Sequence, residues 1–405
     1  MKIEKIVIYR KVFVFFYLLT LLNMKNSLVF GYFSITPMIY VGVILSFIVF
    51  NVDLIVSKKA NGLVLFSYLF VICLIPSVLT SEFLLVSVVK FIPFSLGFIS
   101  FSILGYQLSL ALKRDKEKLF RTIILINRFV ILASLVIYFI GLGFPRNATG
   151  FAGFFNHPQS FGVFLVFFIL LEIMLLRIIN DKYSYVFIST MIVMSYMTES
   201  RLSLGSSLIV IVTYMFIFSK ANIMKKVYIG ALLTLLVTPL LQDIYSVASD
   251  VITKRGRSQS EGIESLADSR FIFVEASIKN FIDKPISGIG FQVSNGKYGH
   301  YQMDTTKSSL FDLPLNASIE KGVFWPSLAE ETGVIGFLGF MAFMIFLVIS
   351  SRSSMTNISI LALFLVGTGE AFLFSFGGLG SYVWLVLFFV FSNKYNEYTD
   401  DVNAI

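Results

Sequence analysis

The sequence contains about a dozen runs of apolar residues, each roughly long enough to cross a lipid bilayer as a helix. A hydrocarbon core about 30 Å thick needs about 20 helical residues to span it. Composition agrees, because 57% of the 405 residues are apolar and only 14% are charged, which leaves more apolar surface than a soluble globule can bury. These features predict an all-α, multi-pass membrane protein and exclude a soluble one.

The apolar runs and the charges that interrupt them predict about twelve transmembrane helices. We expect them near 12–32, 36–56, 61–79, 85–111, 119–141, 158–178, 184–199, 201–219, 226–241, 326–350, 356–376 and 379–392. They divide the chain into N-terminal membrane helices (1–141), central membrane helices (142–241), one large loop (242–325) and C-terminal membrane helices with a tail (326–405). The large loop is the only long connection, so we expect it to hold short helices outside the bilayer.

The formal charge of +8 comes largely from Lys and Arg in short connections between the apolar runs. These basic connections alternate along the chain, so all of them fall on one side of the membrane, which the positive-inside rule makes the cytoplasmic side. Both termini are then cytoplasmic, and the 142–156 connection and the large loop face outward. The charge therefore indicates topology rather than nucleic-acid binding.

The outward connections hold more arginine than the charge rule leads us to expect. They contain Arg146, Arg201, Arg255, Arg257 and Arg270. Guanidinium groups bind phosphate oxygens through paired hydrogen bonds, so this set predicts an anionic ligand such as a lipid pyrophosphate. Two alternatives stay open: Arg255 and Arg257 could merely solvate the loop or contact lipid head groups, and Arg201 could simply neutralise Glu199.

Arg270 follows Asp268, a favourable helix N-cap residue. Apolar residues then recur at helical spacing, at Phe271, Val274, Ile278 and Phe281. We expect a short helix that lies with its apolar side down across the mouth of the site. The Gly288-Ile289-Gly290 segment after it predicts a tight turn rather than a phosphate-binding loop.

Several of these segments together resemble the O-antigen polymerase and ligase family. They are Asp268-Ser269-Arg270, Pro285-Ile286-Ser287-Gly288-Ile289-Gly290-Phe291, the stretch from Leu328 to Gly336 (LAEETGVIG), the stretch from Arg146 to Gln159 (RNATGFAGFFNHPQ) and Ser200-Arg201. Their order and spacing extend the resemblance over residues 140–345, whereas the first four predicted helices are similar only as generic membrane sequence.

The resemblance implies a GT-C-like helical fold and a metal-independent, cofactor-free glycosyl transfer at the outer face of the cytoplasmic (inner) membrane. The donor would be an oligosaccharide linked to undecaprenyl pyrophosphate, and the acceptor a hydroxyl of a second lipid-linked repeat unit. Partners would be membrane lipid, a flippase and a chain-length regulator, with no nucleic acid. The product would be an O-antigen, a capsule or a related polysaccharide.

On this reading, Arg201 and Arg270 stabilise the diphosphate leaving group as the anomeric bond breaks. The substrate-binding candidates are Arg146, Asn156, His157, Arg255 and Arg257. The candidates for general base are His300 and Glu370, since a histidine titrates near neutral pH and a carboxylate inside a membrane protein commonly has a role. A structural or hydrogen-bonding role remains the alternative for His157 and His300.

One departure from the family pattern separates its two branches. Ligases carry a His-Asn pair shortly before the Glu-x-Gly segment, but here the matching stretch reads Gly322-Val323-Phe324-Trp325. The absence of that pair favours a polymerase over a ligase. A carrier for lipid-linked saccharides is the other alternative, although internal symmetry and intramembrane charges, which typify carriers, are scarce.

Overall fold

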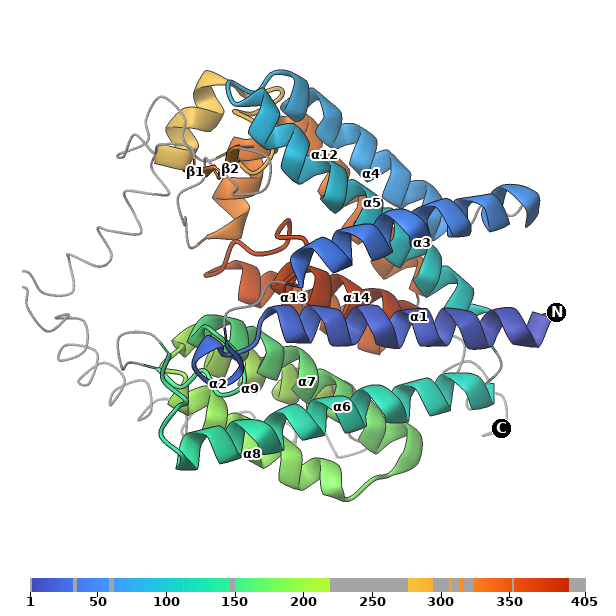
Figure 1. Ribbon diagram of the computed structural model, residues 1–405, viewed down its shortest axis with the longest axis vertical. Coiled ribbons are helices and arrows are strands. Elements are labelled where there is room, and N and C mark those ends of the chain that lie inside the picture. The colour runs from blue at the N-terminus through green and yellow to red at the C-terminus, as the bar shows by residue number, and fades with distance from the viewer. Residues whose placement is uncertain are drawn as a thin grey trace, which may run out of the picture.

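A computed structural model describes residues 2–31, 35–57, 62–111, 113–145, 150–218, 276–293, 306–307, 314–316, 323–351 and 353–392 (Figure 1). Its helices are α1 (Lys2–Asn23), α2 (Ser27–Phe30), α3 (Thr36–Ser57), α4 (Gly62–Leu79), α5 (Leu84–Ser109), α6 (Lys113–Phe139), α7 (Pro158–Ile179), α8 (Tyr183–Met197), α9 (Arg201–Phe218), α12 (Phe324–Ser351), α13 (Ser354–Gly367) and α14 (Leu379–Ser392). Residues 276–283 are also helical. Strands β1 (Thr306–Lys307) and β2 (Pro314–Asn316) form one short antiparallel pair.

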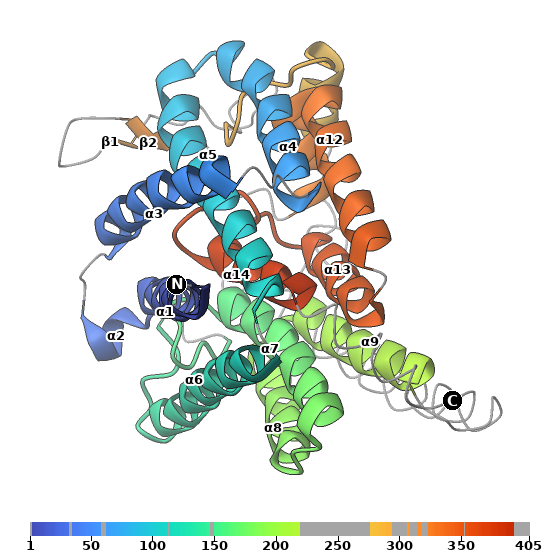
Figure 2. The ribbon, with the colours of Figure 1, turned by 90° about the vertical axis from the view of Figure 1, so that its right-hand side faces the viewer.

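The helices form two groups with a third layer between them, as Figures 1 and 2 both show. Helices α3, α4, α5 and α12 make one group, and α6, α7, α8 and α9 make the other. Between them lie α1, α13 and α14, and α14 contacts both α5 and α7. The two groups are therefore joined through a shared central layer.

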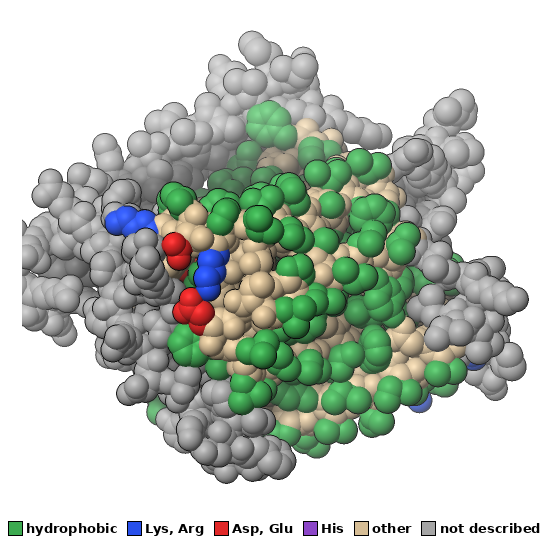
Figure 3. Space-filling view, turned by 90° about the horizontal axis from the view of Figure 1, so that it is seen from above, with side chains coloured by type: hydrophobic (Ala, Val, Ile, Leu, Met, Phe, Trp, Pro, Cys, Tyr) green, Lys and Arg blue, Asp and Glu red, His purple; other side chains and the backbone are tan. Residues whose placement is uncertain are grey.

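The prediction of a multi-pass membrane protein is confirmed. Among the described residues, seven helices are long and apolar enough to cross a bilayer, and four shorter apolar helices accompany them. Large apolar side chains are exposed along the outside of these helices, as expected where the solvent is lipid. Figure 3 shows one such face, on which apolar side chains are numerous and most of the few charged groups lie on the left. The helix predicted at 226–241 lies outside the described residues.

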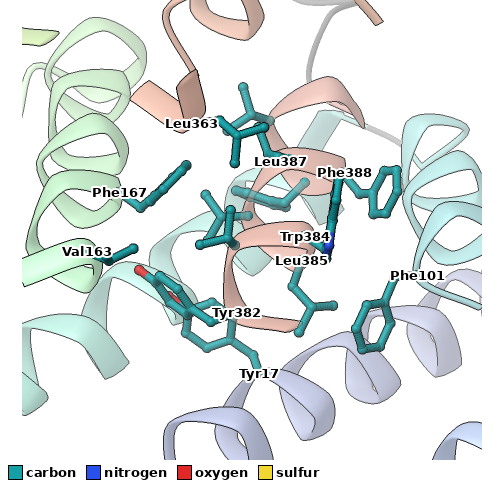
Figure 4. Packing of buried hydrophobic residues seen from close by; sticks show 14 of the residues in the cluster. Tyr17, Phe101, Val163, Phe167, Leu363, Tyr382, Trp384, Leu385, Leu387 and Phe388 are labelled. Carbon is teal, nitrogen blue, oxygen red and sulfur yellow. The ribbon is translucent and has the colours of Figure 1, made fainter. Parts of the chain in front are cut away.

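Helix α14 is the centre of the packing (Figure 4). Its residues are apolar nearly all round, and residues 380–392 are all buried, which is the pattern of a helix enclosed by others. Trp384 packs edge-on against Phe98 of α5 at a ring separation of 4.8 Å, and its indole N–H donates to the carbonyl of Leu373 over 2.8 Å. That bond satisfies the buried N–H donor of Trp384 within the apolar interior.

Helices α4 and α12 approach closely because small residues lie at their contact. A Cβ atom at Gly339 would come within 2.6 Å of Cys73 Cβ, and one at Gly336 within 3.3 Å of Leu74. These glycines therefore permit close packing of the two helices.

A buried ion-pair network ties α6 to the α7–α8 hairpin. Arg128 of α6 donates to both oxygens of the fully buried Glu172, at 2.7 and 2.8 Å, and to Asp181 at 2.7 Å. Ser184 accepts a further bond, and the guanidinium lies over the ring of Phe187. Charges at this depth are stable only when paired, so the network fixes three helices relative to one another.

Two predicted helices end earlier than expected. Helix α1 begins at Lys2 and ends at Asn23, because Asn26 leaves the helix to donate to the carbonyls of Leu142 and Gly153. Helix α13 ends at Gly367, so residues 368–378 form a non-helical connection to α14 rather than a membrane span. Glu370 consequently lies in this connection, half-buried, and not in a hydrocarbon-embedded helix.

Candidate functional site

Most of the loops that hold the sequence motifs lie at one end of the bundle, which we call the loop end. Hydrogen bonds join these loops to one another. The loop end comprises the connections at 24–26, 80–83, 140–145, 150–157, 198–200, 284–293 and 368–378. Asn23 donates to Gly377 at 2.9 Å, the Gln292 side-chain amide donates to the carbonyl of Phe374, and Thr80 donates to Ser287 at 2.9 Å. Segments far apart in the sequence therefore share one face.

The first turns of α7 and α9 lie side by side at the loop end. A Cβ atom at Gly162 of α7 would come within 2.7 Å of Ser203 of α9, and one at Gly150 within 2.7 Å of the Thr198 carbonyl. The amide of Phe151 donates to the carbonyl of Met197 at 2.8 Å, which binds the loop before α7 to the turn before α9. Two positive helix N-termini therefore neighbour one another, an arrangement that favours a nearby anion.

The structure gives Asn156 and His157 local hydrogen-bonding roles. His157 is the N-cap of α7, and its Nδ1 accepts from the amide of Gln159 at 3.2 Å. Pro158 follows at the first helical position, where its fixed φ suits a helix start. Asn156 Oδ1 accepts from the Ser27 hydroxyl at 3.2 Å. The described contacts therefore give His157 a hydrogen-bonding role, which was the alternative to substrate binding.

Arg201 is the first residue of α9, and its side chain is exposed at the loop end. The turn before it is tightly built: Thr198 Oγ1 accepts from the amide of Ser200, and Glu199 takes a left-handed φ of 56°. Among the described residues no carboxylate pairs with Arg201, so the neutralisation by Glu199 is not seen. A cation at the positive end of a helix is electrostatically unfavourable unless an anion joins it.

The glycine-rich segment at 285–290 closes a break in α12. Gly333 has φ 61° and ψ −170° inside that helix, which interrupts its hydrogen bonding. The amides of Ile289 and Gly290 donate to the carbonyls of Glu330 and Glu331, at 2.9 and 3.2 Å. In return, the amide of Val334 donates to Pro285 at 2.8 Å. The prediction of a tight turn is confirmed, and the turn replaces the helical bonds that the break removes.

Gly288 is required at the centre of this contact. Its φ is +73°, and a Cβ atom there would come within 2.6 Å of the carbonyl oxygens of both Glu330 and Glu331. Only glycine adopts that conformation at no steric cost. The Gly-x-Gly and Glu-x-Gly segments are therefore the two sides of one structural contact.

Polar residues missed by the sequence reading connect the same contact. Asn280 Nδ2 donates to Glu330 Oε1 at 2.7 Å, and both side chains are 1% exposed. Glu331 Oε2 accepts from the amide of Gln292 at 3.1 Å and lies near Lys90 of α5. The Glu331 carboxylate therefore binds a segment outside its own helix. Two adjacent acidic residues at the start of an apolar run were the available signal.

The expected apolar underside of the outward helix is wrong for the part that the structure describes. In residues 276–283 the buried side chains are Ser277 and Asn280, whereas of the predicted apolar positions Phe281 is half-buried and Ile278 is 49% exposed. Ile282 is 67% exposed. The Asn280–Glu330 bond explains the orientation, because it turns the polar face of the helix toward α12.

Several predicted site residues lie outside the described residues. They are Arg146, Arg255, Arg257, Arg270 and His300. Of the remaining candidates, Asn156, His157 and Arg201 come together at the neighbouring starts of α7 and α9, and Glu370 lies in the 368–378 connection of the loop end.

The fold defines a multi-pass membrane protein whose helical scaffold holds the described sequence motifs at the loop end. Residues 185–341 match the family model described as O-antigen ligase, a family associated with glycosyl transfer. The match runs from α8 into α12, so it includes Arg201 and both sides of the glycine contact, and it confirms the resemblance seen in the sequence motifs. No curated protein matches the chain.

Proposed function

We propose that this protein is a polysaccharide polymerase, a glycosyltransferase that joins undecaprenyl-pyrophosphate-linked repeat units without a metal ion or cofactor. The observation that carries the proposal is Arg201: it lies within the segment similar to O-antigen ligases, at the neighbouring N-termini of α7 and α9, and no described carboxylate pairs with it.

The proposed chemistry is the transfer of a glycan from one lipid carrier to another. The oxygen of an acceptor sugar hydroxyl bonds to the anomeric carbon of the donor, and the bond from that carbon to the diphosphate breaks. The hydroxyl proton passes to a base, and undecaprenyl pyrophosphate departs. Negative charge develops on the leaving oxygen, and a guanidinium fixed at a helix N-terminus stabilises it.

The remaining candidates keep the roles that the sequence indicates. We propose Arg270 as a second diphosphate contact, and Arg146, Arg255 and Arg257 as donor or acceptor contacts. Glu370 and His300 are the candidates for the base; Glu370 is half-buried at the loop end. Asn156 and His157 support the site by shaping the start of α7.

The same proposal sets the orientation in the membrane. The loop end faces outward, and the opposite end, which holds Arg10 paired to Asp115 at 3.6 Å and exposed basic residues of α6, faces the cytoplasm. The protein then lies in the cytoplasmic membrane with both termini inside. A flippase delivers its substrate, and a chain-length regulator is a further partner.

A ligase is the second candidate, because the matched family model carries that description. The segment Gly322-Val323-Phe324-Trp325 lacks the His-Asn pair that ligases place there, which favours the polymerase.

Deletion of the gene, followed by analysis of surface and lipid-linked glycans, tests the proposal. Loss of a polymerase leaves single repeat units exported and attached. Loss of a ligase leaves polymer on its lipid carrier, and loss of a flippase leaves single units facing the cytoplasm. Surface chains of wild-type length in the deletion strain would contradict the proposal.

A further inference from the structure

The helix at 276–283 buries polar side chains and exposes isoleucines beside charged residues, because Lys279 and Asp283 are also exposed and Phe281 is half-buried. Ser277 and Asn280 are 2% and 1% exposed, whereas Ile278 and Ile282, one turn apart, are 49% and 67% exposed. In an aqueous loop the apolar side of a helix faces the protein and the polar side faces water. Buried polar side chains beneath an exposed mixture of isoleucines and charged residues are expected at a membrane interface, where the protein interior supplies the hydrogen-bond partners.

A buried hydrogen bond fixes this orientation. Asn280 donates to Glu330 of α12 at 2.7 Å. Turning the helix to bury its isoleucines would break this bond and leave Glu330 buried without the Asn280 donor, which is costly. The following turn is bound to the same helix, because the amide of Ile335 donates to the carbonyl of Ile286 at 3.3 Å. The isoleucines therefore face away from the bundle as a property of the docked segment.

The apolar surface of this segment continues onto the bundle. Ile286 is 68% exposed, and next to it on α12 Val334 and Ile335 are exposed, followed one turn later by Leu338 at 59%. Those residues belong to a helix that is long and apolar enough to cross a bilayer. The isoleucine surface is thus continuous with a lipid-facing surface.

Charged groups mark the outer limit of the same region. Lys284 pairs with Glu82 of the α4–α5 turn at 2.7 Å, and both groups are accessible to solvent. Figure 3 shows most of the charged side chains of this face on its left, beside a region where apolar side chains are numerous. A boundary of this kind, with apolar groups on one side and lysine on the other, is the pattern of a helix at a membrane interface.

We propose that the isoleucine surface, defined as Ile278, Ile282 and Ile286, contacts the bilayer at the boundary between acyl chains and head groups. The segment is then an interfacial helix held at the rim of the loop end, at the depth where the pyrophosphate of a lipid-linked substrate would lie. The lipid contact itself does not depend on the proposed function.

Fluorescent labelling at single cysteines tests the lipid contact. Cys73 is the only cysteine of the chain, so replacing it (Cys73→Ala) gives a background for Ile282→Cys and, as a neighbouring control, Asp283→Cys. The full-length variants are labelled with an environment-sensitive dye and reconstituted in phosphatidylcholine–phosphatidylglycerol vesicles. Quenching is measured with nitroxide-labelled lipids and with aqueous iodide. Ile286→Cys provides a second apolar position if Ile282→Cys does not fold.

We expect the label at residue 282 or 286 to be quenched several-fold more by lipid nitroxide than the label at 283, and less by iodide. Iodide quenching equal to that at 283 would overturn the proposal, because the surface would face water. Protection from both quenchers would also overturn it, since another protein surface would then cover the isoleucines. Because no outcome depends on glycan synthesis, failure of the polymerase hypothesis would leave this result interpretable.

Discussion

Gly162 of α7 lies directly against Ser203 of α9, so closely that a Cβ atom on the glycine would be 2.7 Å from both the Cβ and the Oγ of the serine. This contact sets the spacing of two helices whose N-termini meet at the loop end. Arg201 begins the second of them, two residues before Ser203.

Gly162→Ala should therefore separate α7 from α9. Overpacking of this kind costs about 1–3 kcal/mol, and the shift would move Arg201 relative to His157. We expect a lower melting temperature in detergent and shorter surface glycans. Gly205→Ala is the matched control, because nothing lies within 4 Å of a Cβ there and alanine favours a helix. Equal behaviour of the two variants would contradict the close contact.

Gly288→Ala should disrupt the closure of the break in α12. The new Cβ would collide with backbone atoms of Glu330 and Glu331 in addition to holding a positive φ. Gly141→Ala is a control with a similar φ of 77° and open space around the Cβ, so it should cost only the conformational strain of about 1–2 kcal/mol. Thermal unfolding of both variants should place Gly288→Ala clearly lower, and a reversed order would count against the contact.

Arg128→Ala should destabilise the protein more than Glu172→Ala does. Removal of the arginine leaves two carboxylates without their shared cation, whereas removal of Glu172 leaves Arg128 with Asp181. Breaking a buried pair costs about 3–5 kcal/mol, while an exposed pair is worth about 1 kcal/mol or less. Glu117→Ala, which breaks the exposed pair with Arg121, serves as the control. Resistance to proteolysis in detergent should fall in the order Glu117→Ala, Glu172→Ala, Arg128→Ala.

Exchanging the donor and the acceptor tests the hydrogen bond from Asn280 to Glu330. Asn280→Asp places two carboxylates together and should expose the 276–293 segment, while Glu330→Gln keeps an acceptor and should be mild. In the double variant Asn280→Asp/Glu330→Gln, the new amide donates to the new carboxylate, so protection should return. Hydrogen exchange at the amides of Ile289 and Gly290 measures this; Lys284→Ala, which removes an exposed pair, is the control. A double variant no better protected than Asn280→Asp would refute the bond.

Membrane helices could be predicted from the sequence because the length of an apolar run relates directly to bilayer thickness. The ends of these helices could not be predicted, because Asn26 and the residues after Gly367 contact segments that are distant in the sequence. Such contacts leave no local pattern in the sequence. Hydropathy therefore placed α13 correctly but extended it over Glu370.

Arg201 could be singled out because an arginine in a connection that is predicted to face outward conflicts with the charge rule. Asn280 could not, because a lone asparagine in an amphipathic segment is ordinarily solvent-facing, and only its pairing with Glu330 shows which face is buried. The apolar spacing that includes Ile278 correctly indicated a helix, but it did not show which side of the helix packs on the protein, because Ile278 is 49% exposed.

The most direct measurement uses the purified protein with a defined undecaprenyl-pyrophosphate-linked repeat unit and follows both glycan length and release of undecaprenyl pyrophosphate. The wild type should couple repeat units in the presence of a metal chelator. The coupling rate of Arg201→Ala should be lower by about 100-fold or more, which is the usual effect of removing one hydrogen-bond donor that stabilises the transition state. Arg201→Lys should recover little, because an ammonium lacks the planar fork, and Arg121→Ala, an exposed charge loss elsewhere, should match the wild type. Coupling by Arg201→Ala at the wild-type rate would contradict the account.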